Sequence, residues 1–200
     1  MKTFQGTIRK FIKDVLYRPR GVQLDENSYI FPPHRLFFRS HLWIGKNTVI
    51  RPDSYICPLR TYRNQKFNSE ISIGDSVYIG NHAFLVAIDS IRIDDACVLS
   101  EYVYITDNQH GFAPDGGLIM EQPLESKGPI HIGKQCFIGF RACIMPGVTL
   151  GEHCVVGANS VVTRSFPSYS MIAGAPAKLI KIYSLQLKEW LSVDKHEDTI

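Results

Sequence analysis

An aliphatic residue recurs at every sixth position over much of this chain, and that period constrains the fold more than any other feature. Three earlier segments keep the period: residues 44–56, 73–85 and 93–105. The longest uninterrupted run comprises Ile132, Ile138, Ile144, Leu150, Val156 and Val162. A helix would repeat every 3.6 residues and a half-buried strand every 2. Neither element by itself therefore accounts for the pattern.

A period of six fits a solenoid whose unit is a short strand followed by a turn. Three units would close a triangular coil of about 18 residues, and successive coils would stack at roughly the 4.8 Å spacing of strands. The recurring aliphatic residue would point inward, and a small residue four positions later would fill the corner. Cys97, Cys136 and Cys154 occupy that small position, which predicts buried packing residues and not catalytic thiols.

The composition favours a fold made of strands and argues against several classes of protein. Isoleucine occurs 22 times and alanine 9 times, whereas a helical bundle would favour alanine. Five cysteines without a CxxC pair argue against both a disulfide framework and a zinc finger. A net charge of +3 is too small to indicate a nucleic-acid-binding protein. The sequence contains no run of 18 apolar residues, so no membrane-spanning helix is predicted. The first residues contain no apolar segment typical of a secretory signal, so a cytoplasmic protein is expected.

The two ends depart from the repeat. Residues 1–20 place Phe4, Ile8 and Phe11 at helical spacing, which predicts an amphipathic helix that caps the solenoid. Residues 21–183 are expected to form the solenoid domain. Residues 184–200 are expected to form a C-terminal helix over Ser184–Val193 and a frayed tail.

The repeat is interrupted near Ser90–Arg92 and, for about twenty residues, over 111–130. A long excursion from a regular coil is more often functional than structural. His110 stands where this excursion begins, and histidine is the side chain best suited to act as a general base near neutral pH. Asp107, three residues earlier, could hold the imidazole tautomer or the acceptor. No phosphate-binding loop, dinucleotide fingerprint or serine nucleophile elbow occurs in the sequence.

The chain resembles the hexapeptide-repeat acyltransferases, a family with a left-handed parallel β-helix fold. The segments that carry the resemblance are Ile73–Asp75, Ile79–Asn81, Ile132–Lys134, Ile144–Gly151, Val156–Thr163 and Ala173–Lys178. The resemblance implies an all-β, left-handed β-helix with a protruding catalytic loop and short terminal helices. Asp107–Gly111 (D-N-Q-H-G) and Lys127–Gly133 (K-G-P-I-H-I-G) are similar to the maltose/galactoside acetyltransferase-like branch that O-acetylates sugars and cell-surface polysaccharides.

That resemblance also implies the parts of the site. His110 would be the general base of a direct transfer from acetyl-CoA to a sugar hydroxyl, and Asn81 or His82 would contact the acceptor. Acetyl-CoA would lie in a groove between the subunits of a homotrimer, and no metal is expected. The positions that match the family's acetyl-CoA contacts are Phe140, Ala158, Thr163, Arg164, Lys178 and Lys181. A cluster of cations suits the phosphates of the nucleotide end.

The sequence is also compatible with other functions. The same fold serves serine and antibiotic acetyltransferases, whose acceptor choice depends on loops. It also serves zinc-dependent carbonic anhydrases, which need three converging histidines, two of them commonly five residues apart. None of the seven histidines here form such a pair. A non-enzymatic scaffold is the third alternative, and the long loop after His110 argues against it.

Overall fold

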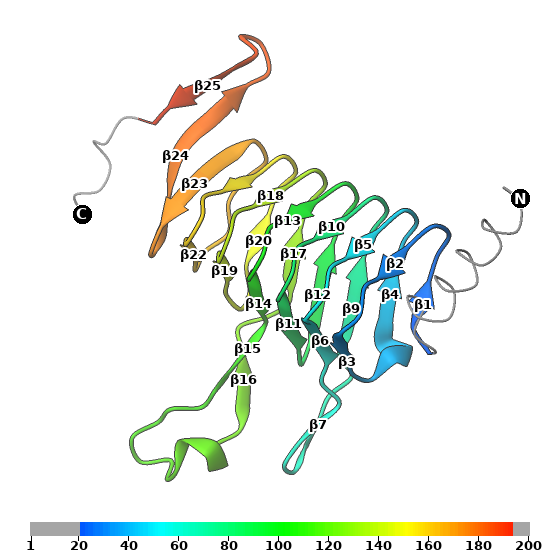
Figure 1. The fold of residues 1–200 in the computed structure, drawn as a ribbon. Coiled ribbons are helices and arrows are strands. Elements are labelled where there is room, and N and C mark those ends of the chain that lie inside the picture. Colours follow the sequence, from blue (N-terminus) through cyan, green and yellow to red (C-terminus); the bar gives the residue numbers. More distant parts are fainter. Residues whose placement is uncertain (1–20, 194–200) are drawn as a thin grey trace, which may run out of the picture.

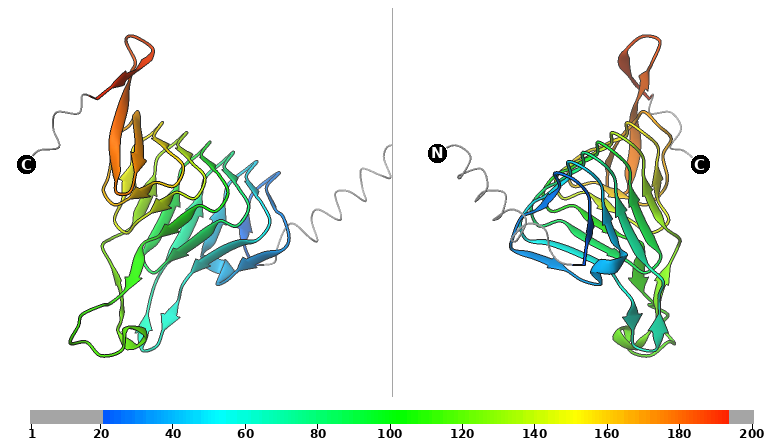
Figure 2. Two further views of the ribbon diagram at one scale, coloured as in Figure 1. Left: turned by 60° about the vertical axis from the view of Figure 1, so that its left-hand side comes forward. Right: turned by 90° about the vertical axis from the view of Figure 1, so that its right-hand side faces the viewer.

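The computed structural model describes residues 21–193, and these form the left-handed parallel β-helix that the repeat and the family resemblance predict (Figure 1). Three parallel sheets make the walls of a triangular prism, and two hairpin-like arms project from it at one corner (Figure 2). The predicted N-terminal helix lies in residues 1–20, outside the described part of the chain.

Each turn of the prism contributes one strand to each sheet. Sheet A contains β1 (Gln23–Leu24), β4 (Leu42–Ile44), β9 (Glu70–Ile73), β12 (Ser90–Ile93), β17 (Ile130–Ile132) and β20 (Thr149–Leu150). Sheet B contains β2 (Tyr29–Ile30), β5 (Val49–Ile50), β10 (Tyr78–Ile79), β13 (Val98–Leu99), β18 (Phe137–Ile138), β21 (Val155–Val156) and β23 (Ser170–Gly174). Sheet C contains β3 (His34–Leu36), β6 (Ser54–Pro58), β11 (Phe84–Ala87), β14 (Tyr104–Thr106), β19 (Cys143–Ile144) and β22 (Val161–Val162). A short 3-10 helix, η1 (Arg39–His41), precedes β4.

The strand register explains the sequence period. Ile132 pairs with Leu150 in sheet A, and Ile144 pairs with Val162 in sheet C. These aliphatic side chains point inward and are fully buried, so one continuous apolar column fills the prism. The small residues predicted for the corners are buried as well. The thiols of Cys97, Cys136 and Cys154 each donate to a backbone carbonyl, at 3.1, 3.1 and 3.2 Å, which confirms their packing role.

Close stacking of the coils leaves no space for a side chain at the glycine that follows each aliphatic residue. A Cβ added to Gly139 would lie 2.7 Å from the backbone nitrogen of Ala158 and 2.7 Å from the carbonyl oxygen of Val156. Both atoms belong to the next coil, where hydrogen bonds on either side restrain the backbone. A larger residue at position 139 must therefore push two coils apart.

Replacing Gly139 by alanine should lower the free energy of unfolding by roughly 1–3 kcal/mol, the usual cost of overpacking. Urea denaturation followed by circular dichroism measures the change. Thr149→Ala, on the exposed outer face of β20, should change stability by less than about 0.5 kcal/mol. Equal stability of the Gly139 variant and the wild type would contradict the close approach of the coils.

The prediction of a C-terminal helix over Ser184–Val193 is wrong. After β23 the chain forms an antiparallel hairpin from β24 (Ala177–Ser184) and β25 (Glu189–Ser192), which extends sheet B beyond the last coil. In Figure 1 this hairpin projects from the end of the prism. Tyr183 and Trp190 pair across it with ring centroids 5.3 Å apart. Pairing with β23 satisfies the backbone groups that the last coil would leave open, so tertiary context overrides the helical spacing of the leucines.

Candidate active site

The excursion predicted over residues 111–130 is an arm that leaves the prism where sheet C ends. We call residues 107–129 the long arm. Its stem is an antiparallel pair of β15 (Asn108–His110) and β16 (Leu124–Ser126), in which His110 lies opposite Leu124. A 3-10 turn, η2 (Ile119–Glu121), lies near its tip. The arm therefore holds His110 on a hydrogen-bonded stem close to the prism and not on a loose loop.

Asp107 anchors the root of the long arm. Its carboxylate is fully buried and accepts hydrogen bonds from the backbone N–H groups of Ile88 and Asp89, both at 2.8 Å. The side-chain amide of Asn108 donates a third, at 3.1 Å. Burial raises the pKa of the Asp107 carboxyl, while the hydrogen bond from Ile88 opposes that rise. Both carboxylate oxygens thus have partners other than His110, which Asp107 was expected to orient.

Replacing Asp107 by asparagine should destabilise the fold by roughly 1–3 kcal/mol. The side-chain N–H2 would take the place of one carboxylate oxygen and face the backbone N–H of either Ile88 or Asp89, which leaves buried donors unpaired. Calorimetry measures the change as a drop in Tm of about 2–4 °C per kcal/mol for a chain of this size. Asp115→Asn, on an exposed turn of the same arm, is the matched control. An unchanged Tm in the Asp107 variant would argue against an anchoring role.

His110 is half-buried against a second arm. Its Nδ1 atom is buried and has no hydrogen-bond partner among the described residues. The imidazole packs against Tyr62 with ring centroids 5.4 Å apart and an interplanar angle of 75°. A histidine with an unpartnered buried nitrogen at the base of a projecting arm is a candidate for binding a ligand or exchanging a proton with it.

Sequence reasoning missed the second arm, which carries Tyr62. We call residues 59–69 the short arm, and its stem is formed by β7 (Thr61–Tyr62) and β8 (Gln65–Lys66). The arms lie side by side below the prism in both views (Figures 1 and 2). The sequence does contain a sign of this arm. The interval between the aliphatic residues Ile56 and Ile73 does not fit the six-residue period, which indicates an insertion between two coils.

Asn81 and His82 lie at the corner between sheets B and C. The side-chain oxygen of Asn81 is buried and unpartnered among the described residues. His82 stacks on Tyr102 with ring centroids 4.6 Å apart and lies 3.9 Å from the carboxylate of Asp53. Asn81 and His82 lie just before β11 of sheet C, whereas His110 comes after the end of β14 in the same sheet. Strands of about three residues separate the two edges by roughly 10 Å, so the structure does not bring these candidates together within one chain.

The candidate acetyl-CoA contacts lie on the last coils. Phe140 and Ala158 occupy the same B–C corner on adjacent coils, where the N–H of Asn159 donates to the carbonyl oxygen of Phe140 at 2.8 Å. Arg141 lies over the Phe140 ring, with 5.0 Å between guanidinium and centroid.

The cationic candidates lie farther along the chain. Thr163 and Arg164 follow β22, and Arg164 lies over Phe166 at 5.2 Å. Lys178 and Lys181 lie on β24 opposite residues of β23. The C-terminal hairpin thus adds positive charge to the end of the prism that also carries Phe140 and Ala158.

The outer face of sheet C carries a ladder of aromatic side chains, which we call the aromatic ladder. Its members are Phe37, Tyr55, Phe84 and Tyr104. Successive ring centroids are 5.1, 4.8 and 5.2 Å apart. Phe37 and Tyr104 are exposed and the two central rings are half-buried. An apolar ladder of this length on an outer face is typical of a surface that packs against another protein.

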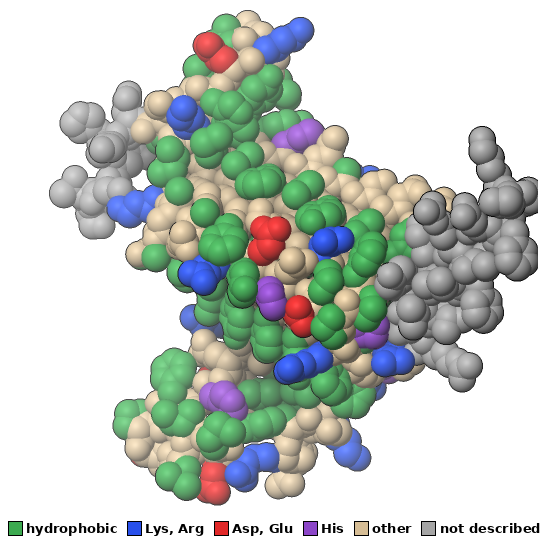
Figure 3. All heavy atoms as spheres, in the orientation of Figure 1, with side chains coloured by type: hydrophobic (Ala, Val, Ile, Leu, Met, Phe, Trp, Pro, Cys, Tyr) green, Lys and Arg blue, Asp and Glu red, His purple; other side chains and the backbone are tan. Residues whose placement is uncertain are grey.

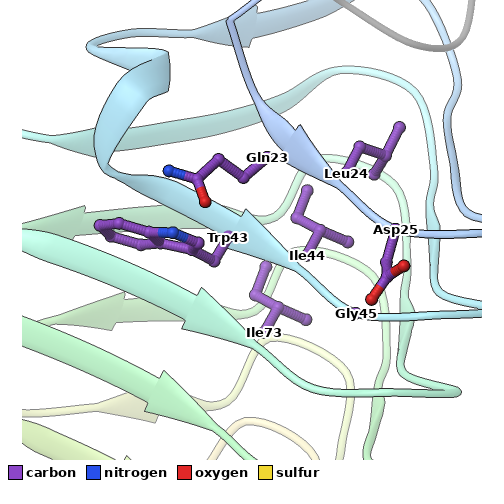
Figure 4. Close-up of a pocket in the computed structure, with 7 residues that line it drawn as sticks. All are labelled: Gln23, Leu24, Asp25, Trp43, Ile44, Gly45 and Ile73. Carbon is purple, nitrogen blue, oxygen red and sulfur yellow. The ribbon is translucent and has the colours of Figure 1, made fainter.

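A cavity of about 460 Å³ lies elsewhere, at the end of sheet A where the described chain begins. Figure 4 shows its lining residues: Gln23, Leu24, Asp25, Trp43, Ile44, Gly45 and Ile73. None of the candidate site residues belongs to it. This cavity therefore gives no support to the site around His110.

No group of three or more His, Cys, Asp or Glu side chains over residues 21–193 is arranged to hold a metal ion. Within the same range, no helix has the length and apolar character needed to cross a membrane.

Sequence comparison identifies similar proteins. A family model described as the hexapeptide repeat of succinyl-transferase matches residues 129–164. The chain is 31% identical over 177 residues to WcaF of Escherichia coli K12, which carries the name of a colanic acid biosynthesis acetyltransferase; the match covers 88% of this chain and 82% of WcaF. It is 33% identical over 127 residues to E. coli K12 WbbJ, named for O-acetyl transfer in lipopolysaccharide biosynthesis. That match covers 60% of this chain but only 64% of WbbJ.

Solved structures share the fold. AntD, an N-acyltransferase from Bacillus cereus in complex with dTDP and 3-hydroxybutyryl-CoA, superposes with a TM-score of 0.71 at 19% identity, over 90% of both chains. The hexapeptide-repeat-containing acetyltransferase VCA0836 from Vibrio cholerae gives a TM-score of 0.54 at 24% identity, over 89% of this chain and 81% of that one.

Proposed function

Because this chain belongs to the hexapeptide-repeat acyltransferase family, we propose that it transfers an acetyl group from acetyl-CoA to a sugar hydroxyl. The acceptor would be a surface polysaccharide or its precursor, as the names of WcaF and WbbJ suggest. The observation that carries the proposal is His110, half-buried at the base of the long arm with an unpartnered ring nitrogen. The reaction would take place in the cytoplasm, where acetyl-CoA is available.

In the proposed mechanism His110 accepts the proton of the sugar hydroxyl while the hydroxyl oxygen attacks the thioester carbonyl. Collapse of the tetrahedral adduct then breaks the carbon–sulfur bond. His110 returns its proton to the departing thiolate, so that CoA leaves as the free thiol and the imidazole is neutral again. Cys97, Cys136 and Cys154 take no part, because they are buried in the core.

The site would be completed by a second copy of the chain. The aromatic ladder covers sheet C, whose two edges carry Asn81 with His82 and the long arm with His110. If three copies pack with their ladders toward a common axis, one edge of each sheet C meets the opposite edge of its neighbour. Asn81 and His82 of one subunit would then face His110 of the next. This supports a homotrimer with shared active sites.

Acetyl-CoA would lie along the same subunit boundary. Phe140 and Ala158 would border the pantetheine, and Thr163 would meet it farther along. The guanidinium of Arg164 and the ammonium groups of Lys178 and Lys181 would bind the phosphates of the nucleotide end. Their position on the last coils and the C-terminal hairpin supports this arrangement.

An acceptor screen with acetyl-CoA tests the proposal by measuring release of the CoA thiol. The acceptors are free sugars, nucleotide sugars, lipid-linked oligosaccharides, matching amino sugars, serine and an aminoglycoside. Release that depends on a sugar hydroxyl supports O-acetylation, whereas faster release with the amino sugar would assign N-acetylation. Release only with serine or the antibiotic would overturn the sugar assignment. Failure with every acceptor, together with stoichiometric zinc in the purified protein, would favour a carbonic anhydrase.

A further inference from the structure

The short arm is fastened to the long arm at two separate places. Near the tip, the Tyr62 hydroxyl donates to the carbonyl oxygen of Met120 at 2.8 Å, and Arg63 Nε donates to the same oxygen at 2.9 Å. Arg63 also lies 3.5 Å from the carboxylate of Glu121. Near the base, Gln65 binds Leu124. The two arms are therefore one clamped unit, although some sixty residues separate the paired positions in sequence.

The contact at the base acts on the strand that faces His110. Gln65 Oε1 accepts from the N–H of Leu124 at 2.7 Å, and Gln65 Nε2 donates to its carbonyl oxygen at 3.0 Å. Leu124 is the residue of β16 directly opposite His110. Both of its backbone groups point away from β15 toward Gln65, whose side-chain amide takes the place of a third strand. Gln65 thereby fixes the position of the strand beside the histidine.

Tyr62 acts on the imidazole itself. Its ring packs edge to face with His110, while its hydroxyl is fastened to the backbone of η2. The carboxylate oxygens of Asp107 have other partners. Among the described residues, the ring of Tyr62 is therefore the contact that we consider for orienting the imidazole. Figure 3 shows hydrophobic side chains gathered over these arms, at the bottom of the view.

We propose that Tyr62 is a positioning residue for His110, and that Gln65 holds the strand against which His110 is set. The inference rests on the proposed function for its catalytic consequence. General-base catalysis depends on the direction of the imidazole lone pair, and a misplacement of about 1 Å can lower the rate by about 100-fold. The short arm would supply that precision in place of a carboxylate partner.

The kinetic test compares Tyr62→Ala with Tyr62→Phe. Alanine should lower kcat by roughly 10–100-fold with little change in KM for acetyl-CoA, because the imidazole loses its packing surface. Phenylalanine keeps the ring, and Arg63 still holds the carbonyl of Met120, so kcat should stay within about threefold of wild type. In a His110→Ala background, Tyr62→Ala should cause no further loss. An additive loss there, or equal losses in both variants, would overturn the positioning role.

Hydrogen exchange tests the clamp without reference to activity. Gln65→Glu replaces a donor by a charged acceptor against the carbonyl of Leu124, and should accelerate exchange of long-arm amides by at least about tenfold. Lys66→Ala, on the same strand but exposed, is the control and should leave exchange unchanged. Unchanged exchange in Gln65→Glu would overturn the clamp. A wild-type protein that transfers no acetyl group, yet shows the expected exchange, would refute the proposed function and leave the clamp standing.

Discussion

The His110→Ala variant should transfer acetyl groups about 10²–10⁴-fold more slowly than the wild type at saturating substrate, the usual contribution of a general base. The reason is that no described group close to His110 could replace it, since the Asp107 carboxylate is buried and engaged by backbone N–H groups. The measurement is kcat from CoA thiol release with the best acceptor of the screen.

The control for this prediction is His153→Ala. His153 is half-buried in the turn before β21 and stacks on Tyr169 with ring centroids 5.2 Å apart. Its variant should keep kcat within about twofold, because surface changes of this kind leave the fold intact. If His110→Ala retained near-normal transfer, or if both variants lost activity equally, His110 would not be the base.

A negative charge introduced into the aromatic ladder by Phe84→Glu should both separate the subunits and abolish activity. Phe84 is the centre of the ladder, stacked between Tyr55 and Tyr104 at 4.8 and 5.2 Å. In an isolated chain its outer face meets water, so Phe84→Glu should fold. At a subunit interface the same carboxylate would be buried without a partner, at a cost of several kcal/mol. Sedimentation should show a monomer, and kcat/KM should fall by at least about 100-fold.

The matched control is Thr149→Glu, which places the same charge on the exposed outer face of sheet A. It should remain trimeric and active. A complementation experiment adds a second measure: mixing His110→Ala with Asn81→Ala subunits should restore up to about a quarter of the sites, if each site takes one residue from each neighbour. A trimeric, active Phe84→Glu protein would show that another face makes the assembly.

Much of the fold could be predicted because one repeated local rule generates it. The six-residue period places Ile132 beneath Leu150 and Ile144 beneath Val162, as observed. The same rule identified three buried cysteines and located the long excursion at His110. The prediction failed at the C-terminus, where Leu187, Trp190 and Leu191 have helical spacing but belong to a hairpin that completes sheet B. Local spacing does not report the unpaired edge that such a hairpin covers.

The relation of Asp107 to His110 shows a second limit. The chain bends at Asp107, between β14 and β15. The carboxylate of Asp107 turns toward the backbone of Asp89, while His110 faces the short arm. The motif D-x-x-H therefore predicts two candidate residues but not the contacts that each of them makes. Their surroundings come from segments far away in the sequence.

The sequence by itself determined the solenoid, the column of aliphatic residues inside it and the position of the break that carries His110, because each depends on spacing along one strand-and-turn unit. Only the tertiary structure decided that Tyr62 and Gln65 clamp the long arm and that sheet C carries a continuous aromatic ladder. It also separated Asn81 from His110 by the width of that sheet. These contacts join residues on different coils and arms, and their free energy comes from packing and hydrogen bonds that no local period records.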